Sequence, residues 1–165
     1  MVFIRSLLFS TLALIAVPAA LASDDYRLPD LDGKEHSLEA QKGKWLVINF
    51  WATWCAPCLK EMPDLQAFYD NNRDRANVWG VTFEETPVQT IREFAERLGV
   101  TYPIVGRAND PITPFGEVRV LPTTFIVDPE GKFLQKIEGL VTQAQLESII
   151  AEASLQTASV QSISQ

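Results

Sequence analysis

The sequence has few of the residues that build metal sites and disulfide networks. Its 165 residues include two cysteines, Cys55 and Cys58, and a single histidine, His36. These three side chains cannot supply the four ligands of a structural zinc site, and two cysteines cannot form a framework of several disulfides. No basic block is longer than two residues, and 14 Lys and Arg stand against 21 Asp and Glu. The sequence therefore predicts no metal site and argues against binding to nucleic acid.

The composition is otherwise that of a soluble globular protein. Hydrophobic residues make up 47% of the chain and charged residues 21%, which excludes a disordered or collagen-like chain. A chain of 165 residues normally forms one domain, because two domains sharing this length would have small cores. The sequence therefore predicts one folded domain.

Residues 1–22 are predicted to be a signal peptide. Arg5 is the only charge in this stretch, residues 7–17 form a mostly apolar core, and Ala-Leu-Ala at 20–22 fits a signal-peptidase site. The apolar stretch at 6–21 has 16 residues, whereas a membrane-spanning helix needs about 20. We therefore expect cleavage between Ala22 and Ser23 and export, to the periplasm in a Gram-negative host. An uncleaved membrane anchor is the alternative.

The remainder of the chain alternates between strand-like and helix-like segments. Residues 45–51 are almost continuously apolar and β-prone, as expected of a strand buried on both faces. Hydrophobic periodicity and turn and capping residues place the other elements. We expect strands at 77–83, 123–127 and 132–139, helices at 55–72, 86–99, 111–117 and from 142, a hairpin from 26–28 and 35–38, and irregular structure at 101–110. The uncharged residues 154–165 are expected to form a flexible tail.

This order of elements predicts an α/β fold, with a central mixed β-sheet flanked by helices and an N-terminal β-hairpin. Strands 45–51 and 77–83 should be parallel and joined by a right-handed crossover. Their carboxyl ends then share one edge of the sheet, where ligands usually bind in open α/β sheets. Cys55 and Cys58 come just after strand 45–51, so the sequence places them at this edge.

Cys55 and Cys58 form a C-x-x-C motif that follows a buried strand and opens a helix. The free N–H groups and the positive dipole end of the helix stabilise the thiolate of Cys55, which is the nucleophilic form. Cys58 lies one turn further on, close enough to form a disulfide with Cys55. A static disulfide is the alternative, but closing so short a loop adds little stability. The motif therefore predicts a reactive dithiol.

Residues 50–58, Phe-Trp-Ala-Thr-Trp-Cys-Ala-Pro-Cys, resemble the active-site stretch of the thioredoxin superfamily, and in particular its exported TlpA/ResA-like thiol–disulfide oxidoreductases. Residues 121–128 resemble the family segment that carries a cis-proline opposite the cysteines. Asn49 stands where cytoplasmic thioredoxins have a buried aspartate, and Glu61 matches the acidic residue of the TlpA/ResA-like branch. The resemblance implies a thioredoxin-like domain over residues 23–153, followed by the tail.

The resemblance also implies which residues contact the substrate. Pro122 is expected to follow a cis peptide bond, which would place the Leu121 backbone beside the disulfide and ready to pair with an extended substrate strand. The residues expected at this substrate-binding surface are Trp54, Ala56, Pro57, Leu121 and Pro122.

Glu61 is the candidate proton acceptor of the site. It lies three residues after Cys58, on the same face of the predicted helix and one turn further in. Cys58 must lose its proton to attack the mixed disulfide, and a partly buried carboxylate can take that proton whereas the amide of Asn49 cannot. The family resemblance points to the same residue. An exposed helix glutamate is the alternative.

The resemblance implies a protein-disulfide oxidoreductase that works outside the cytoplasm, with the reductase direction favoured. Cys55 would attack a disulfide in an exported partner protein, and Cys58 would resolve the mixed disulfide. Apocytochrome c thiols and copper-site cysteines are the substrates implied, and a membrane electron donor of the thiol-transporter type would restore the dithiol. No dissociable cofactor is expected, and we expect a monomer.

Three other functions remain open at this stage. A copper chaperone on the same fold would use Cys55 and Cys58 with a third soft ligand, but no histidine follows Cys58. A thiol peroxidase of the superfamily would need Thr-x-x-Cys, whereas one residue separates Thr53 from Cys55. A redox-silent binding module would bind a partner without using Cys55 and Cys58 in any reaction.

The remaining polar and aromatic residues near these segments are given ordinary roles. Trp51 is expected in the core, and Trp54 is expected to be partly exposed beside Cys55. Charged and polar residues of loops and hairpins mostly face water. We therefore expect His36, Lys60, Glu84 and Glu85 at the surface. The alternative for Glu84 and Glu85, which follow the strand at 77–83 on the same edge as the cysteines, is that their charges shape the substrate groove.

Overall fold

The computed structural model describes residues 26–107 and 112–163, so the predicted signal peptide lies outside the described residues. The main sheet has five strands in the order β5-β4-β3-β8-β9. The elements are β1 (Arg27–Pro29), β2 (Glu35–Ser37), the 3-10 helix η1 (Glu39–Gln41), β3 (Trp45–Trp51), α1 (Ala56–Asn71), β4 (Ala76–Thr82), α2 (Val88–Arg97), β5 (Ile104–Arg107), β6 (Ile112–Thr113), β7 (Gly116–Glu117), β8 (Thr123–Val127), β9 (Phe133–Glu138) and α3 (Gln143–Ile163).

The central strand β3 is buried along its whole length, as its apolar sequence predicts. It pairs parallel with β4 and antiparallel with β8, and β9 pairs antiparallel with β8. These pairings confirm the predicted mixed sheet and the small N-terminal hairpin of β1 and β2. Because β3 and β4 run parallel, both point towards the edge of the sheet where the cysteines lie.

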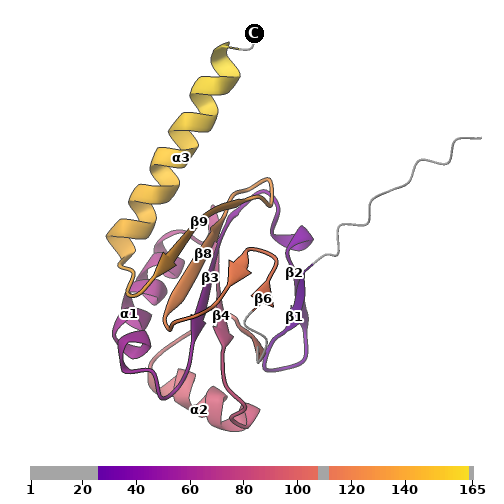
Figure 1. The fold of residues 1–165 in the computed structure, drawn as a ribbon, viewed down its shortest axis with the longest axis vertical. Helices are drawn as coiled ribbons and strands as arrows, with labels where there is room; N and C mark the ends of the chain where they lie inside the picture. The colour runs from indigo at the N-terminus through magenta and orange to yellow at the C-terminus, as the bar shows by residue number, and fades with distance from the viewer. Residues whose placement is uncertain (1–25, 108–111, 164–165) are drawn as a thin grey trace, which may run out of the picture.

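The two faces of the sheet are covered by different kinds of element (Figure 1). Successive β3 side chains point to opposite faces. Val47 and Trp51 pack with core residues of α1, α2 and α3, whereas Ile48 and Phe50 pack with residues of the β1–β2 hairpin and with Phe115 beside β7. The helices therefore form one layer, and hairpins cover the opposite face. Asn49 lies between Val47 and Trp51 in the strand and so faces the helical layer.

Two predictions for residues 101–117 are wrong. Part of the segment expected to be irregular forms β5, which pairs with β4 at the edge of the sheet and continues its hydrogen bonding. In place of the helix expected at 111–117, the described residues form the β6–β7 hairpin. Thr113 stabilises this turn, because its hydroxyl donates to the Gly116 carbonyl and accepts from the Phe115 N–H. Local periodicity did not capture these pairings.

The predicted flexible tail is also different in the structure. The last helix is opened as expected by Thr142, whose hydroxyl accepts the Gln145 N–H at 3.2 Å. The helix α3 then continues to Ile163, well past residue 154. The physical reason is composition, because no glycine or proline follows Gly139 and nothing in the sequence breaks the helix. Figure 1 shows α3 extending beyond the body of the domain.

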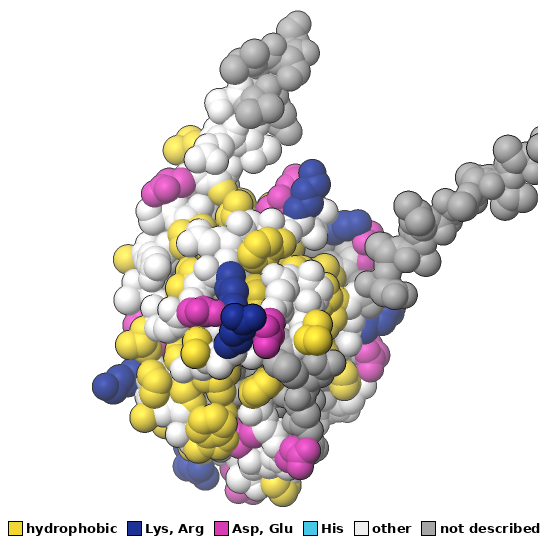
Figure 2. Space-filling view, in the orientation of Figure 1, with side chains coloured by type: hydrophobic (Ala, Val, Ile, Leu, Met, Phe, Trp, Pro, Cys, Tyr) yellow, Lys and Arg dark blue, Asp and Glu magenta, His cyan; other side chains and the backbone are white. Residues whose placement is uncertain are grey.

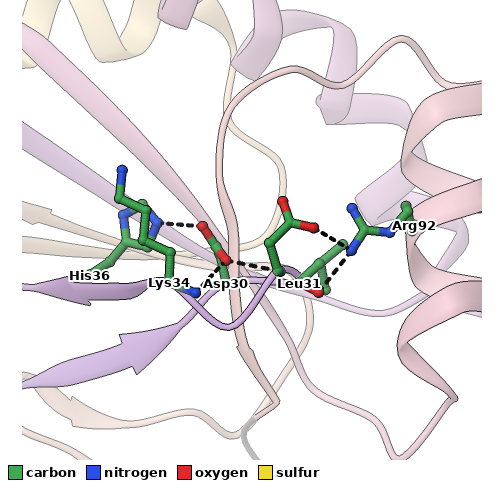
Figure 3. Close-up of polar contacts among 6 residues, drawn as sticks. Asp30, Leu31, Lys34, His36 and Arg92 are labelled. Carbon is green, nitrogen blue, oxygen red and sulfur yellow. Dashed lines mark hydrogen bonds and ion pairs between the residues drawn. The ribbon is translucent and has the colours of Figure 1, made fainter.

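His36 is half-buried and paired, which corrects its expected place on the surface (Figure 3). Its Nε2 lies 2.8 Å from Asp30 Oδ2, and its ring meets Trp79 edge-on. The other carboxylate oxygen of Asp30 accepts the Asp32 and Lys34 N–H groups, each at 2.9 Å. The carboxylate therefore holds together the turn between β1 and β2.

Replacing Asp30 by asparagine should lower the free energy of unfolding at pH 7 by about 1 kcal/mol, because the Asp32 and Lys34 N–H groups and the His36 ring would then face a neutral amide in place of an ionised acceptor. Burial acts to raise the pKa of Asp30, but hydrogen bonds from His36, Lys34 and Asp32 outweigh it and hold that pKa below 3.8. An acid whose pKa is lowered by folding stabilises the fold above its unfolded pKa and loses that contribution as the pH falls through its folded pKa. Urea unfolding of both proteins at neutral and strongly acidic pH measures the difference, which should shrink in acid.

The matched control for this prediction is Asp32→Asn in the same turn. The Asp32 carboxylate is 75% exposed and pairs with Arg92 at 2.7 Å, an interaction worth little in water. An equal loss of stability in Asp32→Asn would show that the pairing of Asp30 with His36 contributes nothing special.

Candidate active site

The two cysteines lie at the corner where β3 gives way to α1. They form a disulfide, so the structure shows the oxidised site. Cys55 is the N-cap of α1, and its Sγ accepts the Cys58 N–H at 3.3 Å. Cys55 is 5% exposed, whereas Cys58 is completely buried. The outer sulfur is thus the one that faces the N-terminal N–H groups of the helix, which favour its thiolate once the disulfide is reduced.

A groove opens on Cys55, and its walls include most of the residues predicted to contact substrate. Trp54 is 68% exposed, and with Ala56, Pro57 and Leu121 it lines this groove. The Leu121–Pro122 bond is cis, as predicted, and Pro122 itself is buried. Figure 2 shows hydrophobic side chains gathered over the end of the molecule where β3 passes into α1.

Further residues of the groove come from segments outside the two motifs that carry the family resemblance. They include Phe83 after β4, and Val118, Arg119 and Val120 before β8. Phe83 ends the strand predicted at 77–83, so it lies at the edge where the cysteines were expected. Nothing in the local sequence marks the three residues before β8, because they reach the groove through the loop after β7. Phe83, Val118 and Val120 make, with Trp54, a mostly apolar surface beside the disulfide, to which Arg119 adds one positive charge.

Glu61 is buried with Cys58 on α1, which excludes the alternative of an exposed helix residue. Its Oε1 accepts a hydrogen bond from Asn49 Nδ2 at 2.7 Å, and its Oε2 accepts the Val141 N–H at 2.9 Å. The carboxylate therefore connects α1 to β3 and to the segment that precedes α3. The contact with Asn49 is between residues that the sequence analysis singled out separately.

Burial raises the pKa of Glu61 to about 7, and the charge of Asp64 adds to this effect. The hydrogen bonds from Val141 and Asn49 act in the opposite direction but are weaker than burial. A carboxyl group with a pKa near 7 can both take up and release a proton at neutral pH, which suits a general acid–base residue.

Glu84 is buried, which corrects its expected place on a solvated loop; Glu85 and Lys60 are exposed as expected. One oxygen of Glu84 accepts the Thr53 N–H at 2.7 Å, and the other accepts the hydroxyl groups of Thr53 and Thr86 at 2.9 and 2.5 Å. Glu84 therefore ties the loop before Cys55 to the loop that precedes α2. Its charged side chain stays buried because three donors surround it.

We expect Glu84→Ala to lower kcat/KM for disulfide reduction about tenfold, because small displacements of reacting groups are costly. The Thr53 N–H would lose its acceptor two residues before Cys55. Insulin reduction measured together with a thermal melt separates a misplaced loop from an unfolded protein. The control is Glu85→Ala in the same loop, which should stay within about twofold of the parent protein. Equal activities of the two variants would contradict this role.

Comparison with known proteins agrees with the geometry. The sequence pattern of the AhpC/TSA family matches residues 21–136. The chain belongs to this family. It is also 38% identical over 133 residues to the thiol-disulfide oxidoreductase ResA of Geobacillus kaustophilus, which covers 80% of this chain and 76% of that protein. The AhpC/TSA chain is thus a ResA/TlpA-like member, as the motif at residues 50–58 predicted.

Solved structures support the same assignment. A DsbF homologue from Corynebacterium diphtheriae superimposes with a TM-score of 0.71 at 29% identity, covering 78% of this chain and 83% of that chain. The exposed lipoprotein thioredoxin Etrx1 of Streptococcus pneumoniae superimposes with a TM-score of 0.66 at 26% identity, covering 78% and 98%. The fold is thioredoxin-like, and the protein is a protein-disulfide oxidoreductase that uses Cys55 and Cys58.

Among residues 26–107 and 112–163, no three or more His, Cys, Asp or Glu side chains come together in a way that could hold a metal ion. No helix of that part of the chain is long and apolar enough to cross a membrane.

Proposed function

We propose that this oxidoreductase is exported and reduces disulfides in exported partner proteins. The observation that carries the proposal is the arrangement of the two sulfurs, with Cys55 opening on an apolar groove and Cys58 buried with Glu61. This arrangement gives the cysteines different tasks. Cys55 meets the partner protein, while Cys58 acts afterwards inside the site.

The proposed cycle begins with both cysteines reduced. The Cys55 thiolate attacks one sulfur of the partner disulfide, so that a mixed disulfide forms and the other partner sulfur leaves as a thiolate. Cys58 gives its proton to Glu61 and attacks Cys55 Sγ. The Cys55–Cys58 disulfide forms, the second partner sulfur leaves, and protons from the solvent and the site neutralise the partner thiolates. Two electrons pass from the enzyme to the partner, and no dissociable cofactor takes part.

The groove fits an extended segment of the partner next to its disulfide. Trp54, Ala56 and Pro57 form one wall, and Leu121, beside the cis peptide bond, stands opposite. Exposed apolar walls gain stability when a partner covers them. The partners proposed are unfolded or extended chains such as apocytochrome c, or proteins with copper-site cysteines. A membrane thiol transporter would return the two electrons, and the enzyme would act as a monomer.

The redox state of the cysteines in living cells tests the proposed direction. Cells are quenched in acid and their free thiols are labelled with an alkylating reagent that adds mass. A reductase should be found mostly with Cys55 and Cys58 reduced, because the electron donor keeps it charged. A predominantly oxidised pair would assign the protein to disulfide formation instead.

Export is the second part of the proposal, and we expect the mature protein to begin at Ser23. It rests on the apolar core at 7–17 and on Ala-Leu-Ala at 20–22. The similarity to a protein described as an exposed lipoprotein is consistent with it. N-terminal sequencing of the protein from the soluble extracytoplasmic fraction should return Ser23. Recovery of Met1 from a membrane fraction would identify a tethered enzyme instead.

A further inference from the structure

Asn49 is the buried partner of Glu61, and only the nitrogen of its side-chain amide makes hydrogen bonds within the described part of the chain. It lies at the middle of β3 with no exposed surface. Its Nδ2 donates to Glu61 Oε1 at 2.7 Å and to Thr124 Oγ1 at 3.0 Å. Its Oδ1 is buried and accepts no hydrogen bond within the described part of the chain. Buried polar atoms nearly always have a partner, so this unpaired oxygen calls for an explanation.

The hydrogen bonds around Glu61 are those of its ionised form. Both carboxylate oxygens accept, one from Asn49 Nδ2 and one from the Val141 N–H. A backbone N–H and an amide NH₂ are donors and cannot receive a hydrogen bond. Each carboxylate oxygen keeps a second lone pair, so a proton there leaves both hydrogen bonds in place, whereas a proton on the lone pair that faces Asn49 gives an O–H group that points at a donor. The cycle proposed above protonates Glu61 after every transfer from Cys58.

We infer that Asn49 is a two-way hydrogen-bond partner of Glu61, whose amide turns over when the carboxyl group takes up a proton. In the ionised state Nδ2 donates to Glu61. In the protonated state Oδ1 occupies the same place and accepts the Glu61 O–H. Asn49 is thus a positioning residue that supports both states of the proton acceptor. The inference rests on the proposed role of Glu61.

Thr124 makes the rotation possible without loss of hydrogen bonds. Its hydroxyl accepts from Nδ2 now, and a hydroxyl can equally donate to Oδ1 after the turn. The position between Glu61 and Thr124 therefore keeps two hydrogen bonds in either orientation. The opposite end of the amide, which now carries Oδ1, has no hydrogen-bond partner within the described part of the chain. No hydrogen bond at that end holds the amide in its present orientation, so the proton on Glu61 decides between the two orientations.

The other ionisable groups around Glu61 must also be considered as acceptors of the Glu61 O–H. Cys58 lies on the same helix and is the proposed proton donor. Asp64, also on α1, accepts the Gln143 N–H at 3.0 Å, and its charge acts on Glu61 from a distance. The Tyr102 hydroxyl, just before β5, is buried and has no hydrogen-bond partner among the described residues, and its pKa is raised by burial and by the charge of Glu61. Tyr102 is therefore the competing acceptor that an experiment must exclude.

The test is NMR of the oxidised wild-type protein, in which the disulfide prevents the thiols from titrating. The chemical shift of the Glu61 carboxyl carbon gives the midpoint of its titration. Spectra are then recorded about two pH units above and below this midpoint. Contacts between the Asn49 amide hydrogens and the Thr124 side chain should be present above the midpoint and lost below it. Unchanged contacts at both ends would overturn the inference. Absence of a Glu61 midpoint in this range would overturn it as well, because both protonation states are needed.

Two variants separate the inference from the proposed function. In Glu61→Gln the amide NH₂ stands in for the acid O–H, so Asn49 should show the turned contacts at every pH. Tyr102→Phe should leave the turn of Asn49 and the Glu61 midpoint unchanged. A wild-type protein in which Asn49 does not turn, with a midpoint that shifts in Tyr102→Phe, would identify Tyr102 as the acceptor. If Glu61→Gln slows resolution of the mixed disulfide while Asn49 never turns, the function stands and the inference fails. If resolution is unaffected, the proposed role of Glu61 fails.

An isosteric replacement gives the expected size of the effect. A fixed donor at Asn49 would stabilise only the carboxylate, and its loss in Asn49→Leu would weaken ionisation of Glu61 about tenfold or more. A two-way partner supports both states, so Asn49→Leu should change the ionisation constant by less than about threefold. Thr124→Val, which removes only the hydroxyl, tests whether each orientation of the amide depends on it.

Discussion

Cys55→Ser is expected to reduce disulfide-reductase activity to the uncatalysed background, whereas Cys58→Ser should accumulate mixed disulfides with partner proteins. The reason is the difference in burial between the two sulfurs. Cys55 faces the groove at the helix N-terminus, and Cys58 is completely enclosed. Without Cys55 no sulfur can reach a partner disulfide. Without Cys58 the first step still occurs, but the product has no thiol to resolve it.

Non-reducing gels of cells that produce each variant measure this difference directly. The Cys58→Ser variant should run in several bands of higher mass that collapse on reduction, and mass spectrometry of these bands would name the partners. Cys55→Ser is the matched control, because it keeps one cysteine in the same motif. Bands from Cys55→Ser with none from Cys58→Ser would reverse the assignment of the two roles. A thermal melt of the purified Cys58→Ser protein like that of the parent protein would confirm that it is folded.

The reactive corner could be predicted because its determinants are local. A run of apolar residues at 45–51 leaves little choice other than a buried strand, and a C-x-x-C motif directly after it defines the start of a helix. The cis bond before Pro122 came from the resemblance at 121–128, since the residues themselves only show that a strand begins there. The C-x-x-C motif thus identified the two reactive sulfurs, whereas the contribution of Leu121 and Pro122 to the site was predicted only from the family resemblance.

Contacts between distant segments could not be predicted in the same way. Glu84 looks like a loop residue until the fold places Thr53 beside it, 31 residues earlier in the chain. His36 is similar, because its burial depends on Trp79 from β4. Strand β5 and the β6–β7 hairpin also depend on pairing rather than on periodicity. In each case a polar or irregular sequence is stabilised by a partner that local patterns do not reveal.

Glu61→Gln is expected to slow resolution of the mixed disulfide about a hundredfold at pH 8, in the range typical of a lost general base. The fold should persist, because glutamine has the same shape and can still accept the Val141 N–H. The rate is measured in single-turnover reactions followed by the fluorescence of Trp54, which lies beside the disulfide. The control is Asp70→Asn, which removes an exposed carboxylate of the same helix and should leave the rate unchanged.

The pH dependence of that rate identifies the group more sharply than its size. Burial raises the pKa of Glu61 from 4.5 to about 7, so the carboxyl is protonated below pH 7 and cannot accept the Cys58 proton. The wild-type rate should therefore rise as the pH increases through about 7 and then level off. In Glu61→Gln this rise should disappear. Only the increase that comes from ionisation of the Cys58 thiol itself should remain, at about pH 8.5 or above. A variant that keeps both the rate and the rise near pH 7 would show that water or the thiols carry the proton.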